Sequence, residues 1–235
     1  MISDLLLMKI QVDTLFVHDN DERLRFINEP FRPEDHPAPV VFIGRTRCGS
    51  VVRFRYDIPE ALCQRVQTII QAQPLSDNLY ESPSYLAKVK DLLTPHITMD
   101  RQWMGPAYRF PDSLGVSPEV VQIDRDTAYL FEFGFSDLVP ELDHCQPVVA
   151  IVEGDKAVSV CQSVRKSVEA EEAGVDTLLS HRGKGYAAQV VARWAGLVRE
   201  QGRIPLYSTS WDNKASQRVA EKLGLQLYGV DIHIS

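Results

Sequence analysis

The sequence predicts an α+β fold, on three observations about the order and spacing of its segments. From Glu119 onward, the patterns follow the order strand, helix, strand, strand, strand, helix, strand, helix, strand. Gly154 and Asp155 separate two apolar runs, as in a β-hairpin. After Gly185, apolar residues recur at helical spacing until Gly202. Strands and helices in this order, with a hairpin among them, are typical of an α+β fold.

In this second half, each element has a start or stop signal. Asp212 or Asn213 is a suitable N-cap for the last helix, and Gly224 ends it. The expected strands are at 119–123, 147–153, 156–164, 169–177, 204–210 and 225–234, and the expected helical segments are at 126–142, 186–202 and 213–224.

The first half predicts an α/β region whose role the sequence does not assign. Apolar spacing favours helices, and Pro59 suits the start of one of them. The expected helices are at 3–17, 60–73 and 84–94, and two strands at 39–46 and 50–57 flank a Cys48-Gly49 turn. Three prolines and several glycine or serine turn signals at 96–118 indicate a boundary there. We therefore divide the chain into an N-terminal region, 1–115, and a second domain, 116–235.

Composition excludes several classes of function. The net charge of −7 argues against nucleic-acid binding, which needs a basic surface. The apolar run Leu5–Met8 is followed by Lys9, so the N-terminus predicts neither a signal peptide nor a membrane span. The four cysteines and six histidines lack metal-ligand spacing. We expect a cytoplasmic protein with reduced thiols, no metal, and no nucleic-acid or membrane partner.

The stretch Arg182-Gly183-Lys184-Gly185-Tyr186-Ala187 opens a predicted helix and suits a phosphate group. A P-loop would require Ser or Thr after Gly183-Lys184, where this chain has Gly185. The dinucleotide pattern GxGxxA is matched by Gly183, Gly185 and Ala188, but too little chain follows for further βα units. A helix start that merely needs a tight turn is the plain structural alternative.

The same stretch resembles the (Q/R)xxGx(G/A) loop of the GNAT superfamily of acetyl-CoA-dependent N-acetyltransferases, with Arg182, Gly185 and Ala187 at its fixed positions. Asn213, Ser216 and the following EKLGL resemble the second signature of that family. The resemblance covers roughly residues 120–235. It implies a mixed, mostly antiparallel central sheet flanked by helices, to which the N-terminal α/β region is an extension or subdomain.

The resemblance implies that acetyl-CoA is the co-substrate and that the glycine loop wraps its pyrophosphate. The residues expected to bind it are Val175, Asp176, Thr177, Arg182, Gly183, Lys184, Gly185, Tyr186, Ala187, Asn213 and Ser216. Backbone N–H groups near 175–177 are the expected donors to the thioester carbonyl. Asn213 has an equally plain interpretation as a helix cap.

Transfer to an amine requires a base, because the amine is mostly protonated at neutral pH. The acidic strand before the loop offers Glu172 and Glu171, with Glu172 slightly favoured because Gly174 leaves space beside it on the same strand face. These charges could equally be solvated strand residues. Many members of the family have a Tyr that acts as a general acid toward the leaving thiolate, and this chain has Ala220 at that position. The substitutes are Tyr207, Ser208, Ser210 and Tyr228.

Three functions remain open at this stage. The first is an N-acetyltransferase in which the amine attacks acetyl-CoA directly in a ternary complex. The second is a non-catalytic acyl-CoA sensor, and the third is a nucleotide-linked oxidoreductase, suggested by GxGxxA alone. For the first, the acidic balance favours a cationic acceptor, either a small molecule or a protein amine. A homodimer is the default oligomer.

Overall fold

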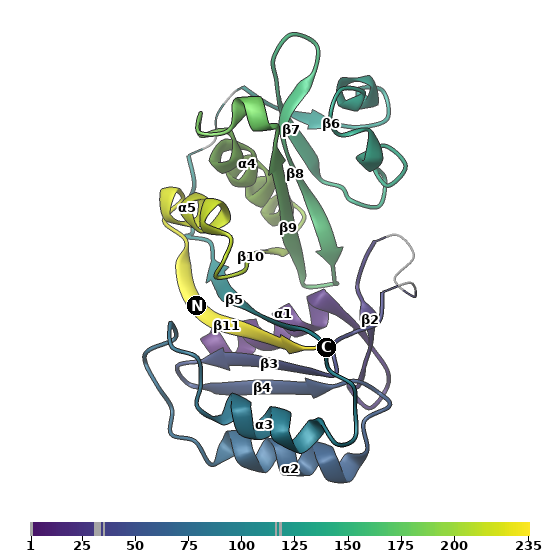
Figure 1. The fold of residues 1–235 in the computed structure, drawn as a ribbon. Helices are drawn as coiled ribbons and strands as arrows, with labels where there is room; N and C mark the ends of the chain where they lie inside the picture. Colours follow the sequence, from purple (N-terminus) through teal and green to yellow (C-terminus); the bar gives the residue numbers. More distant parts are fainter. Residues whose placement is uncertain (1, 31–33, 35, 116, 118) are drawn as a thin grey trace.

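The computed structural model describes residues 2–30, 34, 36–115, 117 and 119–235, and these are dominated by one large sheet (Figure 1). The sheet has nine strands in the order β4-β3-β11-β5-β10-β9-β8-β7-β6. In that order they are β4 (Gly49–Phe54), β3 (Val41–Thr46), β11 (Gln226–Ile234), β5 (Gln102–Arg109), β10 (Ile204–Ser208), β9 (Ala170–Thr177), β8 (Ala157–Lys166), β7 (Val148–Val152) and β6 (Val120–Ile123). The β10–β9 pair is parallel, and the other pairs in this order are antiparallel. A second sheet pairs β1 (Phe16–His18) with β2 (Leu24–Ile27).

Helices cover both faces of the large sheet. They are α1 (Asp4–Leu15), α2 (Glu60–Gln71), α3 (Tyr85–Leu93), α4 (Tyr186–Glu200) and α5 (Lys214–Lys222), with 3₁₀ turns η2 (Ala128–Phe131), η3 (Ser136–Leu138) and η4 (Leu179–His181). Phe42 of β3 packs in the cluster of α1, whereas Ile43 packs in the cluster of α2 and α3. Likewise, Leu206 of β10 packs with α1 and Tyr207 packs with α4. Because successive side chains of a strand point to opposite faces, α1 lies on the face opposite to α2, α3 and α4.

The predicted α+β fold is confirmed, with a mixed, mostly antiparallel sheet flanked by helices. The hairpin turn lies where it was expected: Gly154 and Asp155 both have positive φ, at 54° and 58°, between β7 and β8. The predicted helical connection at 126–142 forms only the short turns η2 and η3. Gly134, with φ of 132°, lies between these turns, and its backbone conformation is not helical.

The turn-rich stretch at 96–118 contains a strand that the sequence analysis did not predict. Within it, β5 occupies the middle of the sheet, between β11 and β10. Gly105 and Pro106 indicated a turn. Pro106 is tolerated because it lies beyond the β10 ladder, which ends at Ala107, and its carbonyl accepts the Thr209 N–H at 3.2 Å.

The predicted division at 115/116 falls between β5 and β6, and residue 116 lies outside the described residues. Strands from the two sides of this point are interleaved in the sheet. β11, the last strand of the chain, pairs with both β3 and β5. The two-domain division therefore stays a prediction, while the sheet itself is continuous across it.

We predict that Gly105→Ala lowers the free energy of unfolding by about 3 kcal/mol. A Cβ at this position would lie 1.7 Å from the Thr209 carbonyl oxygen, and backbone atoms cannot move aside cheaply. Gly196→Ala in α4 is the matched control, since its Cβ would meet nothing closer than Arg193 Nη1 at 4.0 Å. It should stabilise the protein by about 1 kcal/mol through helix propensity. Urea unfolding measures both changes, and an equal effect of the two variants would contradict the close approach of β5 to the 209–210 segment.

Candidate active site

The two parallel strands of the sheet separate soon after they begin to pair. β9 and β10 are in register at Ala170 with Ile204, at Glu171 with Pro205 and at Glu172 with Leu206. Beyond Glu172, β9 continues along β8, while the end of β10 pairs with β5. The split leaves backbone groups and side chains of both strands facing the space between them. The sheet is therefore open at its centre, next to the N-terminal ends of α4 and α5.

A cleft of about 850 Å³ occupies this opening. It is bounded by β9, the loop before α4, the end of β10 and one side of α5. The predicted coenzyme-binding residues that line it are Val175, Asp176, Thr177, Arg182, Gly183, Gly185, Tyr186, Ala187, Asn213 and Ser216. Lys184 is not among the residues that line the cleft. Its Nζ lies 3.2 Å from Glu153 Oε1, and its ammonium lies over the Tyr186 ring at 5.4 Å from the ring centre.

The glycine loop has the backbone conformation that the sequence indicated. Gly183 and Gly185 have φ of 84° and 89°, in the left-handed region that other residues rarely adopt. Gly185 is the N-cap of α4, and it makes no side-chain capping bond. The first N–H groups of a helix have no partner within that helix, and the helix dipole adds partial positive charge there. This end of the cleft therefore suits an anion.

Two cations of α5 line the cleft although the sequence analysis did not select them. Arg218 and Lys222 lie one helical turn apart, so both side chains project from the same side of α5. Lys222 Nζ would lie 3.3 Å from a Cβ added to Gly185, so its ammonium lies beside the loop. Their i, i+4 spacing on the helix after Asn213 was the signal that could have found them. Arg182 contributes a further cation, with its Nε donating to the Thr177 carbonyl at 3.1 Å.

Asn213 and Ser216 connect the start of α5 to β10. The Asn213 side chain accepts the Ser216 N–H at 3.1 Å, so it caps the helix as the plain interpretation predicted. It also lines the cleft. Ser216 Oγ is 2.7 Å from the Tyr207 hydroxyl, which fixes the start of α5 against β10.

Glu172 lies at the point where β9 and β10 separate. It is buried, and its Oε1 accepts two hydrogen bonds from Ser208, from the N–H at 2.6 Å and from Oγ at 2.8 Å. Oε2 is buried and has no hydrogen-bond partner in the part of the chain that the structure describes. Burial raises the pKa of Glu172 to about 7, against the opposing effect of the Ser208 hydrogen bonds. Glu172 does not line the cleft, but Ser208 does.

Glu171 has a different environment, because alternation turns it to the other face of β9. Its two oxygens accept hydrogen bonds from Arg203 and from the Ser163 hydroxyl. Ser163 Oγ also accepts the Trp194 Nε1–H at 2.9 Å. Both carboxylate oxygens of Glu171 are thus used in a buried network under α4. This arrangement is that of a structural ion pair, and it leaves Glu172 as the acidic candidate next to the cleft.

Glu172 has an acidic neighbour within the sheet. Asp231 of β11 is buried, and its Oδ2 accepts the Gln11 Nε2–H at 2.6 Å, while Oδ1 has no partner. Burial, and secondarily the charge of Glu172, raises the pKa of Asp231 well above its ordinary value. Burial in the sheet therefore favours the neutral form of the Asp231 carboxyl group.

The candidates for protonating a leaving thiolate fall into two groups. Ala220, in place of the usual Tyr, is buried under α4. Tyr207 and Ser208 line the cleft, whereas Tyr228 is buried against Gln11 and donates a hydrogen bond to it. Ser210 is not among the lining residues.

The expected thioester donors at 175–177 are partly used within the protein. The Thr177 N–H donates to Asp176 Oδ1 at 2.7 Å, so it is not free for a ligand. All three residues nevertheless line the cleft.

A glycine loop at a helix N-terminus, beside a split between two parallel strands, defines an α+β protein with a cleft in its sheet that suits an anion. Residues 149–229 match the GNAT acetyltransferase family. This match covers less than half of the chain and includes the glycine loop, Glu172 and Asn213. It confirms the resemblance of the C-terminal half to the GNAT superfamily. The family match and the fold support a function of the N-acetyltransferase type.

Solved structures of GNAT proteins are similar to this chain at low identity. A GCN5-related N-acetyltransferase-like protein from Streptococcus suis has 16% identity and a TM-score of 0.48 over 87% of this chain and 86% of that one. A GNAT-family acetyltransferase from Colwellia psychrerythraea has 14% identity and a TM-score of 0.46 over 79% and 76%. A GNAT-family structure from Novosphingobium aromaticivorans has 14% identity and a TM-score of 0.45 over 58% of this chain. The match spans 66% of that protein, which is just under two thirds of its length. No curated protein matches the sequence. At these identities and TM-scores, the structures add no functional argument of their own.

The described residues show neither a helix that could span a membrane nor a metal-binding cluster. None of their helices is both long enough and apolar enough to span a membrane. Within the same residues, no group of three or more His, Cys, Asp or Glu side chains is arranged to hold a metal ion.

Proposed function

We propose that the protein is an N-acetyltransferase that moves an acetyl group from acetyl-CoA to an amine by direct attack in a ternary complex. The observation that carries this proposal is one cleft with two chemically different parts. Glycines with positive φ and the cations Arg182, Arg218 and Lys222 lie at its outer part. At its inner part, Ser208 connects the cleft to a buried carboxyl group whose pKa is about 7.

The residues present fit the coenzyme. Bound acetyl-CoA supplies the activated acetyl thioester. The N–H groups at the start of α4 and the nearby cations neutralise a pyrophosphate, and a glycine at 185 leaves room for it beside Lys222. Val175 and Tyr207 provide cleft wall on the two diverging strands. The loop is thus the anchor, and the split between the strands directs the acetyl end toward Glu172.

Glu172 is the proton acceptor in this proposal, through the Ser208 hydroxyl. The ammonium form of the acceptor first loses one proton to solvent, because only the neutral amine has a free electron pair. As its nitrogen then forms a bond to the acetyl carbon and the C–S bond breaks, a second proton must leave the nitrogen. Ser208 Oγ accepts that proton while it passes its own to Glu172 Oε1, 2.8 Å away. A carboxyl group with a pKa of about 7 is suitably balanced for this transfer at neutral pH. The thiolate is protonated from solvent, because burial raises the pKa of the Tyr207 hydroxyl far above its ordinary value and makes it a poor proton donor.

The acceptor and setting are part of the same proposal. The net charge of −7 favours a cationic amine, either small or on a protein. We infer a cytoplasmic protein, with a homodimer as the default assembly.

A non-catalytic acyl-CoA sensor is the second candidate. Two observations favour it. Ala220 stands where many family members have a Tyr that acts as general acid, and Glu172 is only 3% exposed, so it does not contact a ligand in the cleft directly. The sensor would use the same loop and cleft but would form no product.

Calorimetric titration with acetyl-CoA, beside NADH and NADPH, tests the proposal first. We expect micromolar binding of acetyl-CoA alone, followed by product formation with at least one member of an amine panel. Binding without any product would favour the sensor. Binding of NADH or NADPH in place of acetyl-CoA would overturn both the acetyltransferase and the sensor proposals. It would instead support the dinucleotide interpretation of the GxGxxA pattern.

A further inference from the structure

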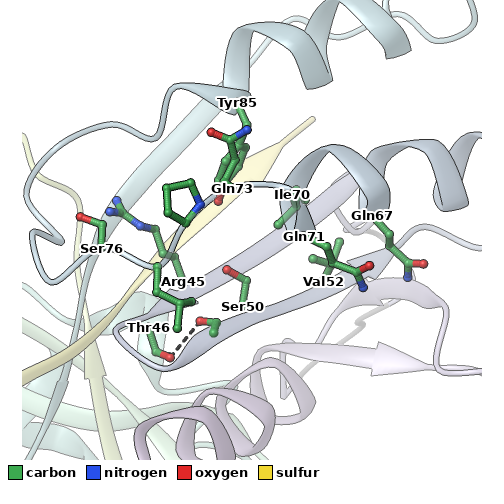
Figure 2. A pocket seen from close by; sticks show the side chains of 13 residues that line it. Arg45, Thr46, Ser50, Val52, Gln67, Ile70, Gln71, Gln73, Ser76 and Tyr85 are labelled. Carbon is green, nitrogen blue, oxygen red and sulfur yellow. Dashed lines mark hydrogen bonds between the residues drawn. The ribbon is translucent and has the colours of Figure 1, made fainter.

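A second cavity lies in the N-terminal region, between the β3–β4 hairpin and the C-terminal end of α2. Its volume is about 320 Å³, near the lower end of the range for small-molecule sites. Figure 2 shows Arg45, Thr46 and Ser50 on the sheet side of the cavity and Gln67 and Gln71 on the α2 side. The segment after α2 and the start of α3 complete its wall. The match to the GNAT family begins far beyond these residues.

Arg45 provides the only charge among the described residues that line this cavity. Its side chain is buried, and the residue is 8% exposed. Nη1 donates to the Glu81 carbonyl at 2.7 Å and Nη2 donates to the Asn78 carbonyl at 2.8 Å. These carbonyls fix the guanidinium but do not neutralise it, and among the described residues no carboxylate forms an ion pair with it. A buried cation without a counter-charge is unfavourable, so an anion placed beside it gains from both charge and hydrogen bonding.

A second buried group in the same cavity is only weakly paired. Tyr85 is 5% exposed, and its buried hydroxyl makes no hydrogen bond of ordinary geometry with a described residue, although the Ser50 hydroxyl lies near enough to interact with it. Leaving such a group unsatisfied costs about 1–3 kcal/mol, which an acceptor in the cavity would recover. The amides of Gln67, Gln71 and Gln73 add uncharged donors and acceptors to the wall. Among the described residues, no acidic side chain lines the cavity, so none of them offers a counter-charge to an ammonium group.

We propose that this cavity binds a small organic carboxylate, which is held by Arg45 and the Tyr85 hydroxyl. The glutamine amides contact the uncharged remainder of the molecule. This binding is separate from acetyl transfer, since it uses none of the residues of the coenzyme cleft. Although the chain as a whole has a net charge of −7, the charge that lines this cavity is the positive charge of Arg45.

Thermal unfolding with matched pairs of probes tests the proposal. The probes are succinate and succinamide, benzoate and benzamide, and glutamate and glutamine, all at the same ionic strength and with coenzyme A present to occupy the other cleft. We expect at least one carboxylate to raise the Tm while its amide does not. Equal Tm values for every carboxylate and its amide would overturn the proposal.

Variants then place the effect in this cavity. Arg45→Gln should abolish the shift caused by the carboxylate. Tyr85→Phe removes a hydroxyl that interacts only weakly with Ser50, so it should leave the unliganded Tm nearly unchanged and weaken binding of the carboxylate about tenfold. Tyr56→Phe is the control, because Tyr56 is exposed and outside the cavity. If Arg45→Gln does not fold, Tyr85→Phe decides: undiminished binding in that variant would contradict the site.

Discussion

Gly185→Val is expected to lower the affinity for acetyl-CoA at least 100-fold, a loss of about 3 kcal/mol. Gly185 has φ of 89°, which a β-branched residue adopts only under strain. The new side chain would also occupy the space between the loop and Lys222, whose Nζ lies 3.3 Å from the added Cβ position. Both effects act where the helix N–H groups face the cleft. Calorimetric titration with acetyl-CoA measures the change.

Gly202→Val is the matched control for this prediction. Gly202 follows the other end of α4, has φ of 77°, and would place its Cβ within 4 Å of nothing. The variant therefore carries similar backbone strain without entering the cleft. We expect both variants to lose stability in urea and only Gly185→Val to lose the coenzyme. Unchanged affinity in Gly185→Val would mean that the loop does not hold the coenzyme.

The sequence was most informative where a local rule decides the structure. The left-handed glycines at 183 and 185, the Asn213 cap and the hairpin turn at Gly154 each depend on a few adjacent residues. Alternation along β9 also places Glu172 and Glu171 on opposite faces of the strand, which slightly favoured Glu172. In the structure the two carboxyl groups also differ in hydrogen bonding. Among the described residues, Glu172 Oε2 has no partner, whereas both oxygens of Glu171 accept hydrogen bonds.

Long-range pairing decided what the sequence could not predict. β5 contains Gly105 and Pro106, two turn signals, yet it is a central strand because β11 returns from the C-terminus to pair with it. Lys222 became a cleft residue only through the packing of α5 beside the glycine loop. The burial of Glu172 likewise depends on elements far away in sequence, since α1 covers that face of the sheet. The central position of β5 and the burial of Glu172 have no signal within their own segments, and the spacing of Arg218 and Lys222 indicates only that they share one side of α5.

Glu172→Gln is expected to lower kcat by about 10²–10⁴-fold while leaving the affinity for acetyl-CoA nearly unchanged. The amide keeps an oxygen for the Ser208 hydrogen bonds but cannot accept the amine proton. In the wild type, kcat/KM should rise with pH through about 7 as Glu172 loses its proton, and the variant should lose this limb. Stopped assays with the acceptor found in the amine panel give both profiles.

Glu171→Gln is the control next to it. This change breaks the buried contact with Arg203, so it should cost about 3 kcal/mol or more of stability. The kcat of the folded fraction should be preserved. A loss of kcat in Glu171→Gln together with full activity in Glu172→Gln would reverse the assignment of the two carboxyl groups.

The raised pKa of Glu172 also predicts how stability depends on pH. Below pH 4.5 the group is protonated in both the folded and the unfolded chain. Between 4.5 and about 7 the folded chain keeps a proton that the unfolded chain has lost, so the free energy of unfolding falls as pH rises. Above pH 7 this decrease in the free energy of unfolding is complete and amounts to at most about 3 kcal/mol.

Glu172→Gln removes this pH dependence, so the stability of the variant relative to the wild type should increase from pH 5 to pH 8 in urea unfolding. Glu172→Gln also removes the charge that helps to raise the pKa of Asp231, so the difference between the two proteins reports Glu172 together with its effect on Asp231. A constant difference across that range would show that Glu172 is already ionised in the folded protein, and a base with an ordinary pKa would then have to replace it in the proposed proton transfer.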